Sequence, residues 1–320
     1  MIGWVAKSFS VLPFVSSRNS LSSLRLCATL HPLKLSFAAA TALGAVAGWG
    51  MVEPYRLRVR RFLVALPGLP RAAQGLRIVQ ISDLHAGLIT PPAWTRHILR
   101  LAAAQNPDLI VFTGDLVSRR NAYLPPLRPF ARPITDYARR LVAPLRELSA
   151  TEGVWAVPGN HDLWRGPSGL EHPGDFGPVR HHLEAGGARC LRNEAVRLAN
   201  GLWLVGLDDL REGAPDVARA TRDVPADDAQ LVLSHNPRLA ALLAGRNALV
   251  LSGHTHGGQA RFPGPFRLYP VDSMSTSWQA GWWQVGRAQL YVSVGAGHIG
   301  APFRLGVPPE IAVFTLEAAS

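Results

Sequence analysis

The chain has 320 residues, of which 48% are hydrophobic and 17% are charged. This composition excludes an intrinsically disordered polar chain, and the length allows one large domain or two small ones. The formal net charge is +11, but residues 1–75 carry +8 of it and the remaining residues carry only +3. A nucleic-acid-binding body would carry a basic face, so we expect no nucleic acid as the natural partner.

An uncharged segment of 18 residues runs from Leu35 to Val52, between Lys34 and Glu53. As a helix it would be about 27 Å long, close to the hydrocarbon thickness of a bilayer. We therefore predict an N-terminal extension over residues 1–34 and one transmembrane anchor over residues 35–52. Two alternatives stay open: a secretory signal with a very long leading region, and an organelle transit sequence, since residues 1–34 contain Ser and Arg but no acid.

Residues 53–75 are predicted to form a linker that includes an edge strand, because residues 56–60 alternate polar and apolar side chains. From Leu76 the chain alternates between the two kinds of element: strand 76–81, helix 92–104, strand 108–113, helix 136–148 and strand 153–157. Further strands are predicted at 202–207, 230–234, 247–252, 288–294 and 311–316. This order predicts an α/β domain over residues 76–320.

Polar side chains follow five of these strands, at the point where each strand ends. They are Asp83 and His85; Asp115; Asn160, His161 and Asp162; His235; and His254 and His256. Strand ends that face a common edge of an α/β sheet form its binding site, so we expect these side chains to lie together.

Seven of these residues are candidate metal ligands: Asp83, His85, Asp115, Asn160, His235, His254 and His256. Carboxylate combined with imidazole suits Mn, Fe or Zn, and residues two apart in an extended backbone point to the same side. Each segment alone has a bland explanation, because Asp often caps a helix and a single His is more often a satisfied residue than a ligand. Their joint occurrence at successive strand ends is what points to a metal site.

The series Asp83-x-His85, Gly114-Asp115, Gly159-Asn160-His161-Asp162, His235 and Gly253-His254-Thr255-His256 resembles the calcineurin-like metallophosphoesterase superfamily. The resemblance runs from about Leu76 to the C-terminus, with all five motifs in the family's order. The segment 253–259 is similar to a branch of small membrane-anchored bacterial phosphodiesterases that includes UDP-2,3-diacylglucosamine hydrolases.

The resemblance implies a four-layer αββα sandwich, here preceded by one N-terminal transmembrane helix. It also implies two divalent metal ions, Mn, Zn or Fe. One ion would take Asp83, His85, Asp115 and His256, and the other would take Asp115, Asn160, His235 and His254. A hydroxide shared by the two ions would attack the phosphorus, and His161 would be the catalytic residue that faces the scissile phosphate. Arg304 is a candidate contact for the phosphate of the substrate.

One position departs from the family pattern. Superfamily members often carry an acid three residues after the bridging Asp, which orients the catalytic His, and this chain has Ser118 there. We expect Asp162 or a backbone carbonyl to orient His161 instead.

The predicted function is therefore hydrolysis of a phosphodiester or pyrophosphate bond by metal-bound hydroxide. A lipid-linked nucleotide such as UDP-2,3-diacylglucosamine is one candidate substrate. The alternatives are a broad-specificity phosphodiesterase and a non-catalytic metal-binding scaffold. The predicted location is the cell inner membrane, with the catalytic domain in the cytoplasm.

Overall fold

The computed structural model describes residues 40–119, 124–166, 172–261 and 278–319. The chain divides into two units, Met1–Gly48 and Trp49–Ser320. Residues 40–52 are helical, whereas the predicted extension and the first residues of the predicted anchor lie outside the described residues. In the part of the chain that the structure describes, no helix combines the length and the apolar character that crossing a membrane requires.

The second unit is built on two six-stranded sheets. The first sheet has the order β1 (Arg58–Leu66), β12 (Glu310–Ala318), β2 (Arg77–Ile81), β3 (Leu109–Thr113), β4 (Val154–Val157) and β5 (Arg189–Cys190). The second has the order β10 (Gly281–Val285), β11 (Ala288–Val292), β9 (Ala248–Ser252), β8 (Gln230–Leu233), β7 (Trp203–Gly206) and β6 (Glu194–Arg197). Strands β2 to β5 are parallel, as are β7, β8, β9 and β11, while β12 pairs antiparallel with β2. In the second sheet β10 pairs antiparallel with β11 and β6 with β7, so both sheets are mixed.

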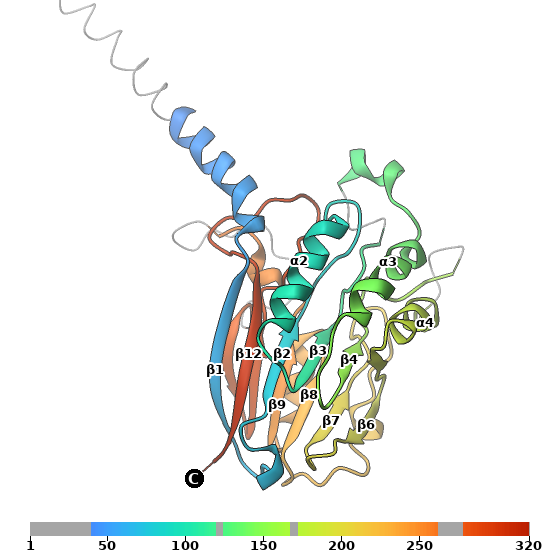
Figure 1. Cartoon of the computed structure of the whole chain (residues 1–320), viewed down its shortest axis with the longest axis vertical. Helices are drawn as coiled ribbons and strands as arrows, with labels where there is room; N and C mark the ends of the chain where they lie inside the picture. The colour runs from blue at the N-terminus through green and yellow to red at the C-terminus, as the bar shows by residue number, and fades with distance from the viewer. Residues whose placement is uncertain (1–39, 120–123, 167–171, 262–277, 320) are drawn as a thin grey trace, which may run out of the picture. The chain divides into compact units, whose positions relative to one another are not determined.

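Helices cover the outer faces of both sheets. On the first sheet lie α2 (Pro92–Ala103), α3 (Ile134–Arg146) and α4 (Gly177–Ala185), side by side in Figure 1. On the second sheet pack α5 (Val217–Ala220) and the 3₁₀ helix η5 (Pro237–Leu243). Within the described residues, the other short 3₁₀ helices are η1 (Glu53–Tyr55), η2 (Arg71–Ala73), η4 (Pro125–Phe130) and η6 (His256–Gly258).

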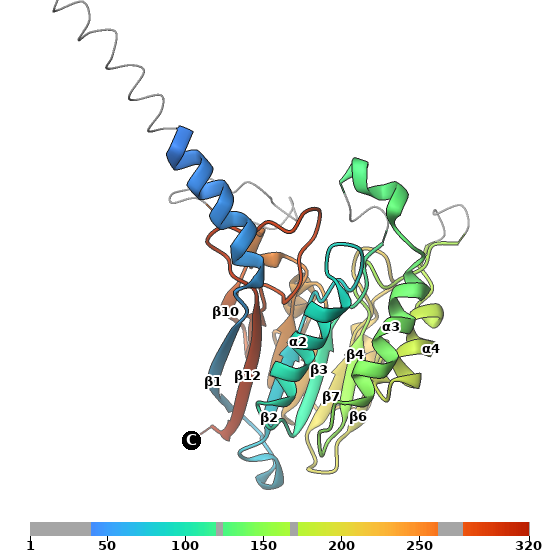
Figure 2. The same ribbon diagram turned by 45° about the horizontal axis from the view of Figure 1, so that its top comes forward.

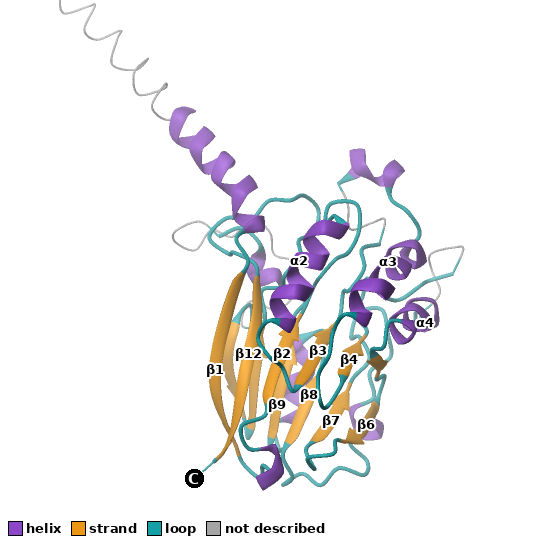
Figure 3. Cartoon of the chain, in the orientation of Figure 1, coloured by secondary structure: helices purple, strands orange, loops and turns teal. Residues whose placement is uncertain are grey.

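The central strands are apolar on both faces, which is why they lie between layers rather than at a surface. In β2, Ile78 faces the core between the two sheets, and its neighbour Val79 faces the core under the helices. In β3, Val111 and Phe112 divide in the same way. The result is the order helix, sheet, sheet, helix. Figure 3 distinguishes the helices (purple) from the strands (orange). The predicted α/β class is confirmed, and the layers agree with the sandwich that the resemblance implies.

One edge of the sandwich collects the strand ends that carry the candidate ligands. Because β2, β3 and β4 are parallel, their carboxyl ends point the same way, toward the end of the unit opposite the C-terminus in Figures 1 and 2. The side chain of Gln80 links the two sheets there, since its Nε2 donates to Thr113 Oγ1 (2.9 Å) and to the carbonyl of Ser252 (3.0 Å). The loops after strands of both sheets therefore meet at this edge.

Candidate metal centre

Two clusters of buried ligand atoms lie at this edge. In the first, Asp83, His85 and His256 bring one ligand atom each within 4.8 Å of one another. His85 Nε2 is 3.1 Å from His256 Nε2, and His256 Nε2 is 3.3 Å from Asp83 Oδ1. Two imidazole nitrogens and a carboxylate oxygen that converge in this way are the donors expected around one transition-metal ion.

The second cluster contains Asp115, His235 and His254, again within 4.8 Å. His254 Nδ1 is 3.1 Å from His235 Nε2, which is 3.2 Å from Asp115 Oδ2. The same Asp115 oxygen lies 3.5 Å from His85 Nε2 of the first cluster. One carboxylate oxygen therefore lies between the two clusters.

Asn160 comes from the loop after β4, and its side-chain oxygen Oδ1 is buried with no hydrogen-bond partner among the described residues. A buried carbonyl oxygen without a partner costs about 1–3 kcal/mol unless something satisfies it. A divalent cation would do so, which fits the predicted ligand role of Asn160. The donor set as a whole therefore suits two divalent ions.

Neighbouring groups orient two of the histidines. The carbonyl of Thr113 is 2.9 Å from His235 Nδ1, and the Ser118 hydroxyl oxygen is 3.2 Å from His85 Nδ1. If each Nδ1–H donates to its oxygen, the lone pair is left on Nε2, the nitrogen that faces the cluster. The hydroxyl at position 118 thus contacts the ring of His85.

Five of the seven candidate ligands have a left-handed backbone, with φ between +47° and +71°: Asp83, His85, Asp115, His254 and His256. Such values are uncommon outside glycine, and they gather at functional sites where the surrounding structure enforces them. The enforcement is visible at Gly253, where an added Cβ would come within 1.9 Å of Ser82 Oγ and 2.2 Å of Asp83 Oδ2. Only glycine allows the loops after β2 and β9 to approach this closely.

Burial and neighbouring charges set the protonation of the clusters. Burial lowers the pKa of His85 to about 3 and lowers the pKa values of His254 and His256 well below the usual range, so these rings are neutral at pH 7. Burial would also lower the pKa of His235, but the carboxylates of Asp115, Asp83 and Asp209 together outweigh it and raise that pKa to about 10. The carboxylates thus hold a proton at the centre of the site. A cation placed there would displace it, as metal binding commonly does.

His161 lies beside the first cluster, with its ring centroid 5.1 Å from that of His85. Its backbone N–H donates to Asp115 Oδ1 (2.7 Å), which fixes the loop against the carboxylate that lies between the clusters. Its ring nitrogen Nδ1 is buried and has no hydrogen-bond partner in the described ranges.

Asp162 braces the same loop. Its two carboxylate oxygens accept hydrogen bonds from the backbone N–H groups of Val117 (3.0 Å) and Gly159 (2.9 Å). The first bond joins the loop after β4 to the loop after β3, and the second lies within the loop after β4, so Asp162 acts on the backbone around His161. Burial raises the pKa of the Asp162 carboxyl to about 7.

Arg304 lies in the segment between β11 and β12 and is fully buried. Its guanidinium donates to the backbone carbonyls of Val307 (3.1 Å), Val294 (2.9 Å) and two nearby glycines, Gly295 and Gly297. A contact between Arg304 and the substrate phosphate stays a prediction.

The structure also brings two residues to the site that the sequence did not single out. Asp209 follows β7, and its buried carboxyl has a pKa raised to about 6 by burial, while His235 opposes that shift. Arg119 donates from Nη1 to the backbone carbonyl of Asn160 (3.0 Å). Burial lowers the pKa of His161, and the charge of Arg119 lowers it further. Asp209 follows a strand as Asp83 and Asp115 do, so its position in the sequence could have predicted a place at the site. Arg119 had no such signal.

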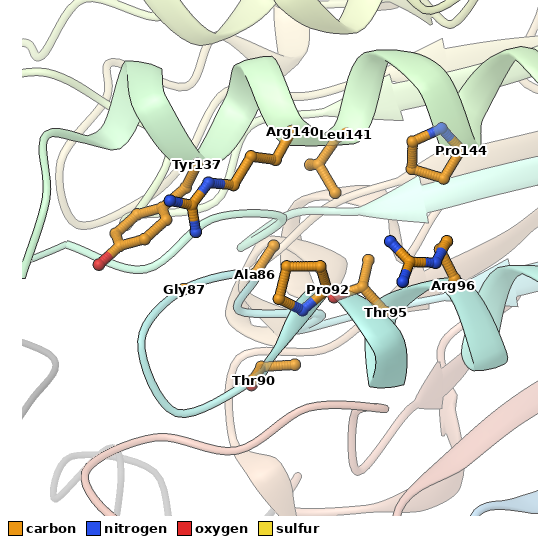
Figure 4. Close-up of a pocket in the computed structure, with 10 residues that line it drawn as sticks. All are labelled: Ala86, Gly87, Thr90, Pro92, Thr95, Arg96, Tyr137, Arg140, Leu141 and Pro144. Carbon is orange, nitrogen blue, oxygen red and sulfur yellow. The ribbon is translucent and has the colours of Figure 1, made fainter.

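A small cavity lies between α2 and α3 (Figure 4), and none of its lining residues belongs to the two clusters. Thr90, Thr95 and Arg96 line one side, and Tyr137 and Arg140 from α3 line the other. Its volume of about 20 Å³ is roughly that of one water molecule. It is too small for a phosphate ester, so it is not a candidate substrate site.

Comparison with known proteins agrees with this site. A family model described as calcineurin-like phosphoesterase matches residues 76–258. The "Uncharacterized metallophosphoesterase YkuE" of Bacillus subtilis is 30% identical over 294 residues, covering 88% of this chain and 94% of that protein. An "Uncharacterized metallophosphoesterase" of Aquifex aeolicus is 30% identical over 285 residues, covering 87% and 97%. A "Transmembrane protein with metallophosphoesterase domain" of Bos taurus is 29% identical and covers 78% of this chain and 55% of its own length.

The chain belongs to the calcineurin-like phosphoesterase family. It is a metal-dependent phosphoester hydrolase, as the motifs predicted. The finer assignment to the UDP-2,3-diacylglucosamine hydrolase branch stays a prediction.

Proposed function

We propose that the protein hydrolyses a phosphodiester or pyrophosphate bond at a centre of two divalent ions. One observation carries this proposal: Asp115 Oδ2 lies 3.2 Å from His235 Nε2 and 3.5 Å from His85 Nε2, between the two clusters. A single carboxylate in that position would bridge two ions. Mn, Zn and Fe are the candidates, since they accept mixed carboxylate and imidazole ligands.

The proposed ligands divide between the two ions, with Asp115 shared. Asp83, His85 and His256 would complete the first set, and Asn160, His235 and His254 would complete the second. When bound, two divalent ions supply a nucleophile near neutral pH and neutralise charge on phosphoryl oxygens. The chain's own contribution is to hold these side chains in a buried, pre-formed arrangement, so that little reorganisation is needed during turnover.

His161 is the proposed catalytic residue. Its place beside the first cluster suits an imidazole that gives a proton to the leaving oxygen or donates a hydrogen bond to the phosphoryl group. Burial lowers its pKa, and a bound phosphate anion would raise that pKa again and favour the protonated ring.

A lipid-linked nucleotide such as UDP-2,3-diacylglucosamine is the proposed substrate, with broad-specificity phosphodiester hydrolysis as the alternative. In support of a membrane location, the relative from Bos taurus has "transmembrane" in its name. We further propose that residues 35–52 anchor the chain in the inner membrane with the catalytic domain in the cytoplasm. Finding the full-length protein outside the membrane fraction of expressing cells would exclude that anchor.

The direct test of the reaction is hydrolysis of bis-p-nitrophenyl phosphate and of UDP-2,3-diacylglucosamine by the purified protein, with added Mn, Zn, Mg or chelator. We expect chelator-sensitive hydrolysis that Asp115→Ala abolishes. Hydrolysis of the lipid nucleotide supports the finer proposal, and hydrolysis of the generic diester alone supports the alternative. Hydrolysis that persists in Asp115→Ala would contradict the shared-carboxylate centre.

A further inference from the structure

A second cavity, of about 240 Å³, adjoins the loop that carries His161. Leu163, Trp164 and Arg165 from the end of this loop line it, together with Arg119. The hydrogen bond from Arg119 Nη1 to the carbonyl of Asn160 ties the cavity wall to a proposed metal ligand. The cavity wall is therefore attached to the loop that carries Asn160 and His161.

The cavity is cationic. Its described lining contains three guanidinium groups, those of Arg119, Arg132 and Arg165, and no carboxylate. Two acids behind the lining offset part of this charge: Glu212 Oε2 lies 3.6 Å from Arg119 and 3.1 Å from Arg165, and Asp136 lies 4.0 Å from Arg132. Among the described residues, the three guanidinium groups outnumber the two acids that contact them.

The start of α3 adds to this field. Pro133, Ile134 and Thr135 line the cavity, and no side chain caps the helix at Pro133. The first N–H groups of a helix carry partial positive charge and favour an anion nearby. This effect supplements that of the three arginines.

The remaining wall is apolar and well supported. Trp164 pairs with Asp175 through two backbone hydrogen bonds of 2.7 Å, which holds Trp164 and the adjacent Arg165 in place. The volume is below the roughly 300–1,000 Å³ of pockets that enclose a whole drug-sized ligand. The cavity suits one charged group of a substrate together with part of its organic moiety.

We propose that this cavity binds a second phosphate group of the substrate, beyond the one that is hydrolysed; this inference rests on the proposed phosphoesterase function. The seven proposed metal ligands would hold the ions that bind the scissile phosphate. A further phosphate needs other donors, and guanidinium groups match its geometry through paired N–H groups. The preferred substrate is therefore an ester with two phosphates, either adjacent as in a pyrophosphate or separated by a sugar.

The test compares substrates that differ by one phosphate. Thymidine 5′-(p-nitrophenyl phosphate) is compared with the same ester carrying a 3′-phosphate, and uridine diphosphate glucose tests an adjacent second phosphate through release of uridine monophosphate. For each two-phosphate substrate, kcat/KM is divided by that for the simple ester. We expect Arg132→Gln and Arg165→Gln to lower this ratio by roughly tenfold or more for at least one of the two-phosphate substrates, mainly through KM. The reason is that each variant removes a charged hydrogen bond to phosphate. The substrate whose ratio falls shows whether the second phosphate is adjacent to the first or separated from it by a sugar.

Arg132 is the safer variant, because its side chain is 61% exposed and contributes little to packing. Arg132→Lys keeps the charge and should restore part of the ratio, whereas Arg222→Gln removes an exposed arginine elsewhere and should leave the ratio unchanged. The proposal is overturned if both glutamine variants leave the ratio unchanged for both two-phosphate substrates, whether or not kcat/KM falls equally for every substrate. A wild-type protein that hydrolyses none of the three with added metal would instead refute the phosphoesterase proposal itself.

Discussion

Strain at the centre resides in single residues. Five candidate ligands hold a positive φ, and each such residue costs about 1–3 kcal/mol that other contacts must offset. Backbone bonds between loops supply part of the offset: Asp83 N donates to the carbonyl of Gly114 (3.0 Å), and His85 N donates to that of Asp115 (2.9 Å). Main-chain pairing between loops therefore helps to hold Asp83 and His85 in this conformation.

The role of His161 can be tested through the leaving group. We expect His161→Gln to lower kcat by about 10²–10⁴ for an alkyl phosphodiester, whose leaving oxygen needs a proton. The loss should be much smaller for bis-p-nitrophenyl phosphate, since p-nitrophenolate leaves without protonation. The measurement is kcat for both substrates at matched metal content. Equal losses for the two would contradict proton donation by His161.

At the residue scale, the sequence predicted which side chains converge but not every contact that orients them. All seven candidate ligands follow strands, and a parallel sheet brings such positions to one edge, so their convergence was predictable. The contact of Ser118 with His85, and the two backbone bonds of Asp162, depend on how neighbouring loops pack. His85 and Ser118 are 33 residues apart, and Val117 and Asp162 are 45 residues apart, separations that no local pattern encodes.

The segment between β11 and β12 is the element on which the first cluster rests. Its Gly297 N donates to the carbonyl of Asp83 (2.9 Å), and an added Cβ at Gly295 would come within 2.8 Å of Asp83 Cβ. Arg304 holds this segment in shape through four backbone carbonyls. Burial lowers the pKa of the guanidinium to about 10, still far above neutral pH, so the group remains charged.

We expect Arg304→Met to destabilise the protein by about 3 kcal/mol, because several buried carbonyls lose their donor at once. Urea denaturation at fixed metal concentration measures this as a lower midpoint, with exposed Arg222→Met as the control. An unchanged midpoint would show that the segment keeps its shape without the guanidinium.

Element prediction succeeded where both faces of a strand are buried. The apolar runs that became β3, β4, β8 and β9 were all predicted within one residue of either end. Helix α4 was not predicted, because its sequence Gly177–Ala185 contains a glycine, a proline and two adjacent histidines and so gives a weak helical pattern. Its fold comes from packing of Val179 and Leu183 against the first sheet. Strand β1 runs to Leu66, beyond the predicted residues 56–60, because it pairs along its whole length with β12.

At the scale of the whole molecule, the segment with the excess of basic residues and the segment with the proposed metal ligands are different parts of the chain. The basic excess lies in residues 1–75, whereas every proposed ligand lies between Asp83 and His256. The family match over residues 76–258 spans all of them. The two sheets supply ligands in nearly equal number, so neither sheet alone could form the centre.

The measurement that tests this account most directly is the number of metal ions bound per chain, by elemental analysis after equilibrium dialysis against Mn, Zn or Fe. We predict two ions per wild-type chain and at most one in Asp115→Ala, since that variant removes the ligand that both sets share. Exposed His181→Ala, on α4, should bind two ions as the wild type does. Equal binding by the wild type and Asp115→Ala, or no binding by the wild type with any of these metals, would contradict the two-ion centre.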